Sequence, residues 1–167
     1  STIFIYIEAS KKIQEYTEPL FAGSESLLPL IVFESSKLLK KYPILNAYCE
    51  NDIIRIYNDI NIGVAFDIDN GLKVYTIKNT EQLSMSAIEK SISIGIDHYL
   101  DKSLTSDQLT GSTFTITDLS SFGASAVVPL INFNQSAILG ISSIDKKLNR
   151  VNISLSFDHR VTEGKVA

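Results

Sequence analysis

Residues 151–164 read VNISLSFDHRVTEG and decide the architecture at the end of the chain. Apolar and polar residues alternate strictly from Val151 to Phe157, which predicts a strand with one buried face. His159 follows that strand almost at once, and the residues after it are typical of the start of a helix. Catalytic groups gather at strand ends in α/β sheets, so this histidine is the first candidate functional residue.

The same periodicity, read outward, predicts further strands and helices. Alternation or short apolar runs predict strands at 2–8, 44–49, 53–57, 61–67, 72–78, 113–117 and 137–144. Helical spacing predicts one helix between Ser26 and Pro43, another over 82–100, and a short one near 11–16. Asp69-Asn70-Gly71 predicts a hairpin turn, because Asn and Gly tolerate positive φ. Together these elements predict an α/β fold of the α+β two-layer kind, a mixed β-sheet covered by two helices.

Length and composition bound the function. The 167 residues, 44% hydrophobic and 20% charged, suit a single globular domain over 1–167. A net charge of −4 argues against a nucleic-acid partner, and the apolar runs are too short for a membrane span. The single cysteine excludes an internal disulfide framework and a cysteine-rich zinc site, and it fits a reducing compartment. Because the chain starts in a strand and ends in an apparent first helical turn, we expect the domain to continue beyond both ends.

Several common site signatures are missing. No glycine-rich phosphate loop follows a strand, and there is neither a Gly-x-Ser-x-Gly elbow nor a His-Glu-x-x-His pair. Cys49 lies in a strand-like segment and is expected to be a small core residue. His98 is expected on the solvated face of its helix, beside Asp97. By spacing alone His159 is a candidate acid–base residue, although its neighbours Asp158 and Arg160 also suit a plain surface ion pair.

Several blocks of the sequence, in order along the chain, carry a family resemblance. These blocks are residues 42–47 (YPILNA), 60–65 (INIGVA), 70–72 (NGL), 77–79 (IKN), 111–119 (GSTFTITDL), 122–123 (FG), 129–132 (PLIN), 137–140 (AILG) and 155–161 (LSFDHRV). Together they resemble the catalytic domain of dihydrolipoamide acyltransferases, the core acyltransferase subunits of the 2-oxoacid dehydrogenase multienzyme complexes. That resemblance covers residues from about 26 to 167 and implies the chloramphenicol acetyltransferase-like fold.

The resemblance implies a reaction and three site residues. Acyl transfer between dihydrolipoamide and coenzyme A needs a base for the attacking thiol, and His159 matches the family's histidine. Thr117 matches the hydroxyl residue that stabilises the tetrahedral oxyanion, and Glu163 matches the residue that orders the histidine loop. The threonines of 113–117 alternate, so Thr117 is expected on the same sheet face as Thr113 and Thr115.

The resemblance also implies the setting of the reaction. Coenzyme A would be a substrate, the lipoyl group would be carried on a separate domain, and no metal would take part. The chain would form a homotrimer that assembles into a cubic or icosahedral core, beside 2-oxoacid decarboxylase and dihydrolipoamide dehydrogenase subunits. Its place would be the prokaryotic cytoplasm or the mitochondrial matrix.

Two departures from the family pattern leave alternatives open. Glu163 stands where the family has Asp or sometimes Asn, and Val74-Tyr75-Thr76 replaces its Val-Pro-Val. One alternative is a structural core homologue with weakened catalysis. Another is an acyltransferase that acts on a carrier-protein thioester.

Overall fold

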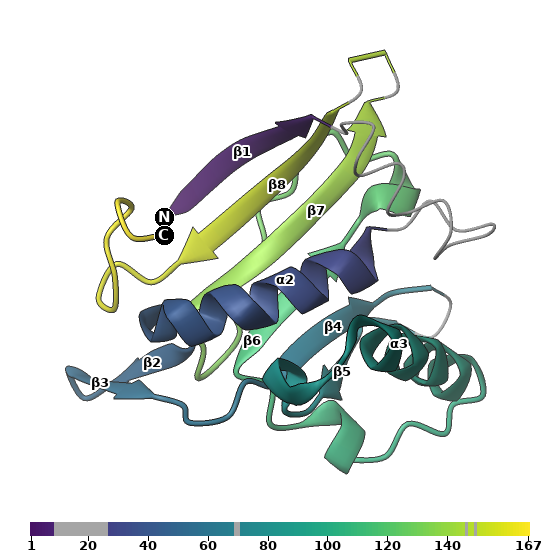
Figure 1. Ribbon diagram of the computed structural model, residues 1–167, viewed down its shortest axis with the longest axis horizontal. Coiled ribbons are helices and arrows are strands. Elements are labelled where there is room, and N and C mark those ends of the chain that lie inside the picture. Colours follow the sequence, from purple (N-terminus) through teal and green to yellow (C-terminus); the bar gives the residue numbers. More distant parts are fainter. Residues whose placement is uncertain (9–26, 69–70, 146, 149) are drawn as a thin grey trace.

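The computed structural model describes residues 1–8, 27–68, 71–145, 147–148 and 150–167 (Figure 1). The strands are β1 (Thr2–Glu8), β2 (Ala47–Glu50), β3 (Ile53–Ile56), β4 (Ile62–Phe66), β5 (Lys73–Ile77), β6 (Phe114–Asp118), β7 (Ala137–Asp145) and β8 (Arg150–Phe157). The α-helices are α2 (Leu28–Lys41) and α3 (Met85–Leu100). Short 3₁₀ turns lie at Pro43–Leu45, Thr80–Gln82, Asp107–Leu109 and Ser120–Phe122.

Six strands form one mixed sheet in the order β1-β8-β7-β6-β4-β5, while β2 and β3 form a separate hairpin. The β4–β6 and β6–β7 pairs are parallel, and the other pairs of the large sheet are antiparallel. Thr117 of β6 pairs with Gly140 of β7, which in turn pairs with Ser154 of β8. This register fixes how far apart the candidate site residues lie.

Both helices pack on one face of the sheet, as Figure 1 shows. The apolar residues of β4 and β6 join Val32 of α2 and Ile88 of α3 in one buried cluster. Ser84 caps α3 by accepting a hydrogen bond from the Ala87 N–H. Gly95 lets α3 approach the sheet, because a Cβ there would lie 2.7 Å from the Tyr75 ring. The predicted two-layer fold with a mixed sheet under two helices is confirmed.

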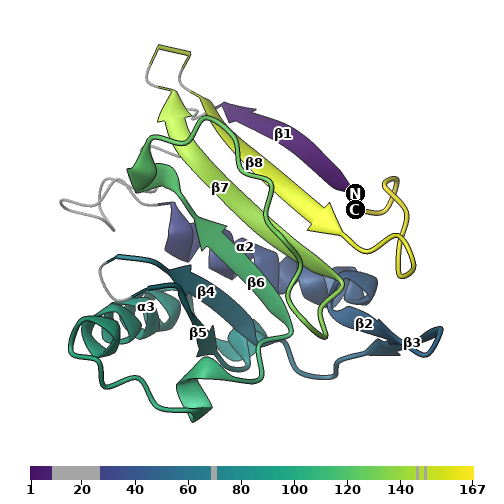
Figure 2. The same cartoon turned by 180° about the vertical axis from the view of Figure 1, so that it is seen from behind.

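The opposite face of the sheet is crossed by the segment 123–136, which Figure 2 shows as an irregular green stretch in front of β6 and β7. Its Gln135 and Asn132 side chains bond to Thr115, and its Val127 packs over Gly140. Thr115 therefore lies on the face away from the helices, and alternation along β6 places Thr117 on that face too.

Several sequence expectations need correction. The strand predicted at 44–49 starts only at Ala47, because Pro43–Leu45 forms a 3₁₀ turn. The helix predicted from residue 82 starts at Met85, after a 3₁₀ turn over Thr80–Gln82. Three expectations fall outside the described residues: the helix near 11–16, Ser26 as the residue before α2, and most of the turn at 69–71.

None of the described helices is long and apolar enough to cross a membrane.

Candidate active site

His159 lies on an exposed turn that directly follows β8. The turn is closed by the Asp158 carbonyl, which accepts hydrogen bonds from the N–H groups of Val161 and Thr162. The imidazole packs against the Phe157 ring, with 4.9 Å between the ring centroids. The ring is therefore held from one side and open to a substrate on the other, as a general base requires.

Asp158 and Arg160 clamp the backbone on both sides of the histidine. The Asp158 carboxylate accepts a 2.9 Å bond from the Arg160 backbone N–H and bonds of 2.7 to 3.1 Å from its guanidinium. The Arg160 guanidinium, through these bonds, holds the pKa of the Asp158 carboxyl below its usual value. The sequence left open a plain surface pair, and the Arg160 side chain is indeed 67% exposed, but the Asp158 side chain is only 16% exposed. The pair therefore shapes the turn that carries His159.

Thr117 lies near the end of β6 and is half-buried. The core-facing positions beside it, Phe114 and Ile116, belong to the hydrophobic cluster under the helices. The Thr117 hydroxyl forms no hydrogen bond with another described residue. It is therefore available to donate to a substrate oxygen, which an oxyanion donor must do.

The structure does not bring His159 and Thr117 together within one chain. Thr117 is level with Ser154, two strand spacings away across β7, or about 10 Å. Phe157 is three residues beyond Ser154, or about another 10 Å along the strand. The backbones of Thr117 and Phe157 are thus about 14 Å apart, and the His159 turn lies beyond Phe157. Within one chain the two candidate groups are therefore well separated across the sheet.

The remaining sequence candidates fall in three different places. Glu163 is exposed at the end of the histidine turn, and its carboxylate bonds to no described residue. His98 is half-buried rather than fully solvated, since its Nδ1 lies 2.9 Å from Nε2 of Gln108. Cys49 is half-buried, so its prediction as a core residue is wrong, because β2 belongs to the outlying hairpin rather than to the sheet.

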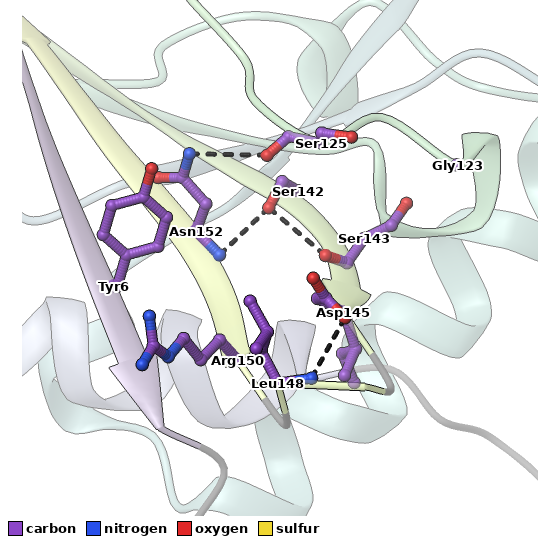
Figure 3. Close-up of a pocket in the computed structure, with 10 residues that line it drawn as sticks. Tyr6, Gly123, Ser125, Ser142, Ser143, Asp145, Leu148, Arg150 and Asn152 are labelled. Atoms are coloured by element: carbon purple, nitrogen blue, oxygen red, sulfur yellow. Dashed lines mark hydrogen bonds between the residues drawn. The ribbon is translucent and has the colours of Figure 1, made fainter.

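Two pockets lie near these elements. The smaller, about 230 Å³, adjoins the histidine turn and is lined by Asp158, Arg160, Cys49 and residues of the crossing segment. A larger one of about 510 Å³ lies over the ends of β7 and β8, where Figure 3 shows Asn152 between Tyr6 and Ser125. Neither His159 nor Thr117 lines the larger pocket. Among the described residues no cluster of His, Cys, Asp and Glu could hold a metal ion.

Sequence reasoning missed a buried polar network next to Thr117. The Thr115 hydroxyl donates to Oε1 of Gln135 at 2.9 Å and accepts from Nδ2 of Asn132 at 2.9 Å. Nε2 of Gln135 donates to the backbone oxygen of Ser112 at 3.0 Å and to its hydroxyl at 3.1 Å. Strand periodicity explained Thr115 as an ordinary β-residue, and no spacing signal marked Gln135.

Comparison with known families decides the relationship. Residues 6–167 match the family described as 2-oxoacid dehydrogenases acyltransferase (catalytic domain). The chain belongs to this family. The acyltransferase family resemblance drawn from the sequence blocks is thereby confirmed.

Three curated relatives illustrate the range of the family. The acetyltransferase component of the pyruvate dehydrogenase complex of Acholeplasma laidlawii is 36% identical, over 75% of this chain and 25% of its own length. The succinyltransferase component of the 2-oxoglutarate dehydrogenase complex of Buchnera aphidicola is 30% identical, over 95% of this chain and 43% of its own. The lipoamide acyltransferase component of the branched-chain alpha-keto acid dehydrogenase complex of Bacillus subtilis is 34% identical, over 78% of this chain and 34% of its own length. This chain spans between a quarter and less than half of these relatives.

Solved structures agree with that assignment. A truncated catalytic core of the 2-oxoacid dehydrogenase multienzyme complex from Thermoplasma acidophilum has a TM-score of 0.88 and 28% identity, over 99% of this chain and 80% of that one. The structure of chloramphenicol acetyltransferase matches 99% of this chain and 82% of its own chain, with a TM-score of 0.64 and 13% sequence identity. This match shows the shared fold alone.

A third solved relative bears on the site. Dihydrolipoamide acetyltransferase of Azotobacter vinelandii has a TM-score of 0.82 and 25% identity, over 99% of this chain and 75% of that one. In that enzyme a serine, a histidine and an asparagine were investigated for their roles in catalysis, and the histidine precedes the asparagine by four positions. His159 and Glu163 have the same spacing.

Proposed function

We propose that this domain transfers an acyl group between dihydrolipoamide and coenzyme A, with His159 as the general base and Thr117 as the oxyanion donor. The observation that carries the proposal is the family match over residues 6–167, combined with an open imidazole on the clamped turn after β8. The free hydroxyl of Thr117 supports its role as donor. Glu163 would order the histidine turn from its far end.

The reaction follows from these groups. The His159 imidazole takes the proton of the attacking thiol, and the thiolate adds to the thioester carbonyl. The carbonyl oxygen becomes an oxyanion, to which the Thr117 hydroxyl donates a hydrogen bond. When the intermediate collapses, the carbon–sulfur bond to the departing thiolate breaks, and that thiolate takes the proton back from the imidazolium. No acyl group is attached to the protein, and the lipoyl group arrives on a separate domain.

The active site would be shared between copies of the chain. Support comes from the separation of about 14 Å between the strand ends that carry the two groups. Exposed apolar side chains on the crossing segment, Leu130 at 87% and Phe133 at 92%, also favour contact with a second copy. We therefore propose a homotrimer in which His159 of one chain faces Thr117 of the next.

The proposed setting follows the relatives. A related structure is the cubic core of a pyruvate dehydrogenase multienzyme complex. The trimers of this chain would build a core of that kind, served by 2-oxoacid decarboxylase and dihydrolipoamide dehydrogenase, in a prokaryotic cytoplasm or a mitochondrial matrix.

Acyl transfer from acetyl-, succinyl- and isobutyryl-coenzyme A to free dihydrolipoamide tests the proposal. His159→Ala should lower kcat by about a hundredfold or more, since general bases contribute 10²–10⁴-fold. His98→Ala, which changes the other histidine of the chain, should stay within about twofold of the parent. No transfer from any of the three donors, or equal effects of the two substitutions, would overturn the proposal.

A further inference from the structure

We infer that the Thr115–Gln135 pair is a positioning device that ties the strand carrying Thr117 to the turn carrying His159. This inference rests on the proposed function and adds two residues to it. Neither side chain would touch the substrate, because Thr115 is fully buried and Gln135 is 5% exposed.

The first half of the connection runs from β6 to the crossing segment. Thr115 lies two residues before Thr117 on the same sheet face, and its hydroxyl both donates to Gln135 and accepts from Asn132. The amide of Gln135 is fully used, since its nitrogen donates to both oxygens of Ser112. A buried network with every member satisfied holds its elements in one arrangement.

The second half runs from the crossing segment to the histidine turn. The residue after Gln135 is Ser136, whose carbonyl accepts a 2.8 Å bond from the Asp158 N–H. Its hydroxyl donates to the Ile44 carbonyl at 3.1 Å, which fixes Ser136 against the 3₁₀ turn that precedes β2. His159 is the next residue after Asp158, so one continuous chain of contacts leads from the oxyanion strand to the general base.

The consequence concerns both groups at once. Loss of the Thr115 hydroxyl leaves the amide of Gln135 without one partner in a buried site, and the crossing segment must shift to recover a bond. A shift of about 1 Å in a catalytic group costs up to about a hundredfold in rate. The effect should therefore appear in the chemical step and leave substrate binding almost unchanged.

The test compares threonine substitutions in the assembled protein. Thr115→Val keeps the shape and removes the hydroxyl, so kcat per folded trimer should fall about tenfold while KM stays within about twofold. Thr115→Ser keeps the hydroxyl and should restore most of kcat.

The matched control is Thr113→Val. Thr113 is also buried, at 3% exposure, but its hydroxyl bonds to the backbone of Asn61 and not to the crossing segment. This variant should lose stability without a comparable loss in kcat.

A folded Thr115→Val trimer with kcat within about twofold of the parent would overturn the inference and leave the proposed function intact. An inactive parent would overturn the proposed function instead. If Thr115→Val does not assemble, Asn132→Ala replaces it in the test. Asn132 is half-buried and donates one hydrogen bond to the Thr115 hydroxyl, so its loss should likewise lower kcat while KM changes little.

Discussion

Removal of the Asp158 carboxylate should loosen the turn that carries His159. Asp158→Asn keeps one oxygen that can accept the Arg160 backbone N–H but loses the charged pairing with the guanidinium. The bonds from the Val161 and Thr162 N–H groups to the Asp158 carbonyl, and from the Asp158 N–H to Ser136, involve only the backbone and remain. The turn is therefore weakened but not dissolved.

The size of the effect depends on which of these hydrogen bonds each substitution removes. We expect Asp158→Asn to lower kcat by about three- to tenfold, and Asp158→Ala, which also frees the Arg160 N–H, by about ten- to a hundredfold. The assay is steady-state acyl transfer, with the Asp107→Asn variant as control. That substitution breaks the Lys78–Asp107 pair, which lies on other elements of the fold and touches neither candidate group. If the Asp158→Asn and Asp158→Ala variants were as active as the parent, the Asp158–Arg160 pair would not be needed to hold the His159 turn.

The same pair gives a pH dependence whose sign is fixed. The pKa of Asp158 is lower in the folded protein than in the unfolded chain, so the pair stabilises the fold above the unfolded pKa of about 3.9. That stabilisation is lost as the pH falls through the folded-state pKa. The melting temperatures of the parent and Asp158→Asn should therefore differ near neutral pH, and the difference should shrink as the pH falls below about 4 and through the folded-state pKa of Asp158. A difference that is the same at all pH values would contradict the assignment.

Two further predictions concern β6 and α3. Thr117→Val should lower kcat by about a hundredfold, and Thr117→Ser should keep most of it, because the donor persists; a change in KM alone would make the hydroxyl a binding contact instead. Gly95→Ala should destabilise the fold by about 1–3 kcal/mol despite alanine's higher helix propensity, because the new methyl would overlap the Tyr75 ring. Chemical denaturation measures the second effect, and a more stable variant would show that the ring can move aside.

The fold was predictable because its strands carry clean patterns. The alternation over 151–157 gave β8, and the threonine alternation gave β6 and the face on which Thr117 lies. Periodicity failed where tertiary context decides. The apolar run at 44–49 resembles one strand, but Pro43 starts a 3₁₀ turn and β2 leaves the sheet for a hairpin.

The candidate site was predictable only in part, for a similar reason. His159 stands beside a recognisable strand end, and Thr117 follows from the family blocks. Gln135 acts through a contact with Thr115 that is twenty residues away in sequence, and no local pattern encodes such a pairing. Asp158 and Arg160 were visible in the sequence as two charges, but the burial of the Asp158 side chain appears only in the folded chain.

The central claim is that one active site needs two chains, and mixed assembly tests it most directly. His159→Ala keeps an intact Thr117, and Thr117→Val keeps an intact His159, so each protein alone should be nearly inactive. After joint unfolding and reassembly in equal amounts, about one quarter of the interfaces in random trimers should pair an intact His159 with an intact Thr117. Activity should rise to about a quarter of the parent value, with mixed trimers verified by native mass spectrometry. Mixed trimers no more active than the two parents would contradict the account and place the whole site within one chain.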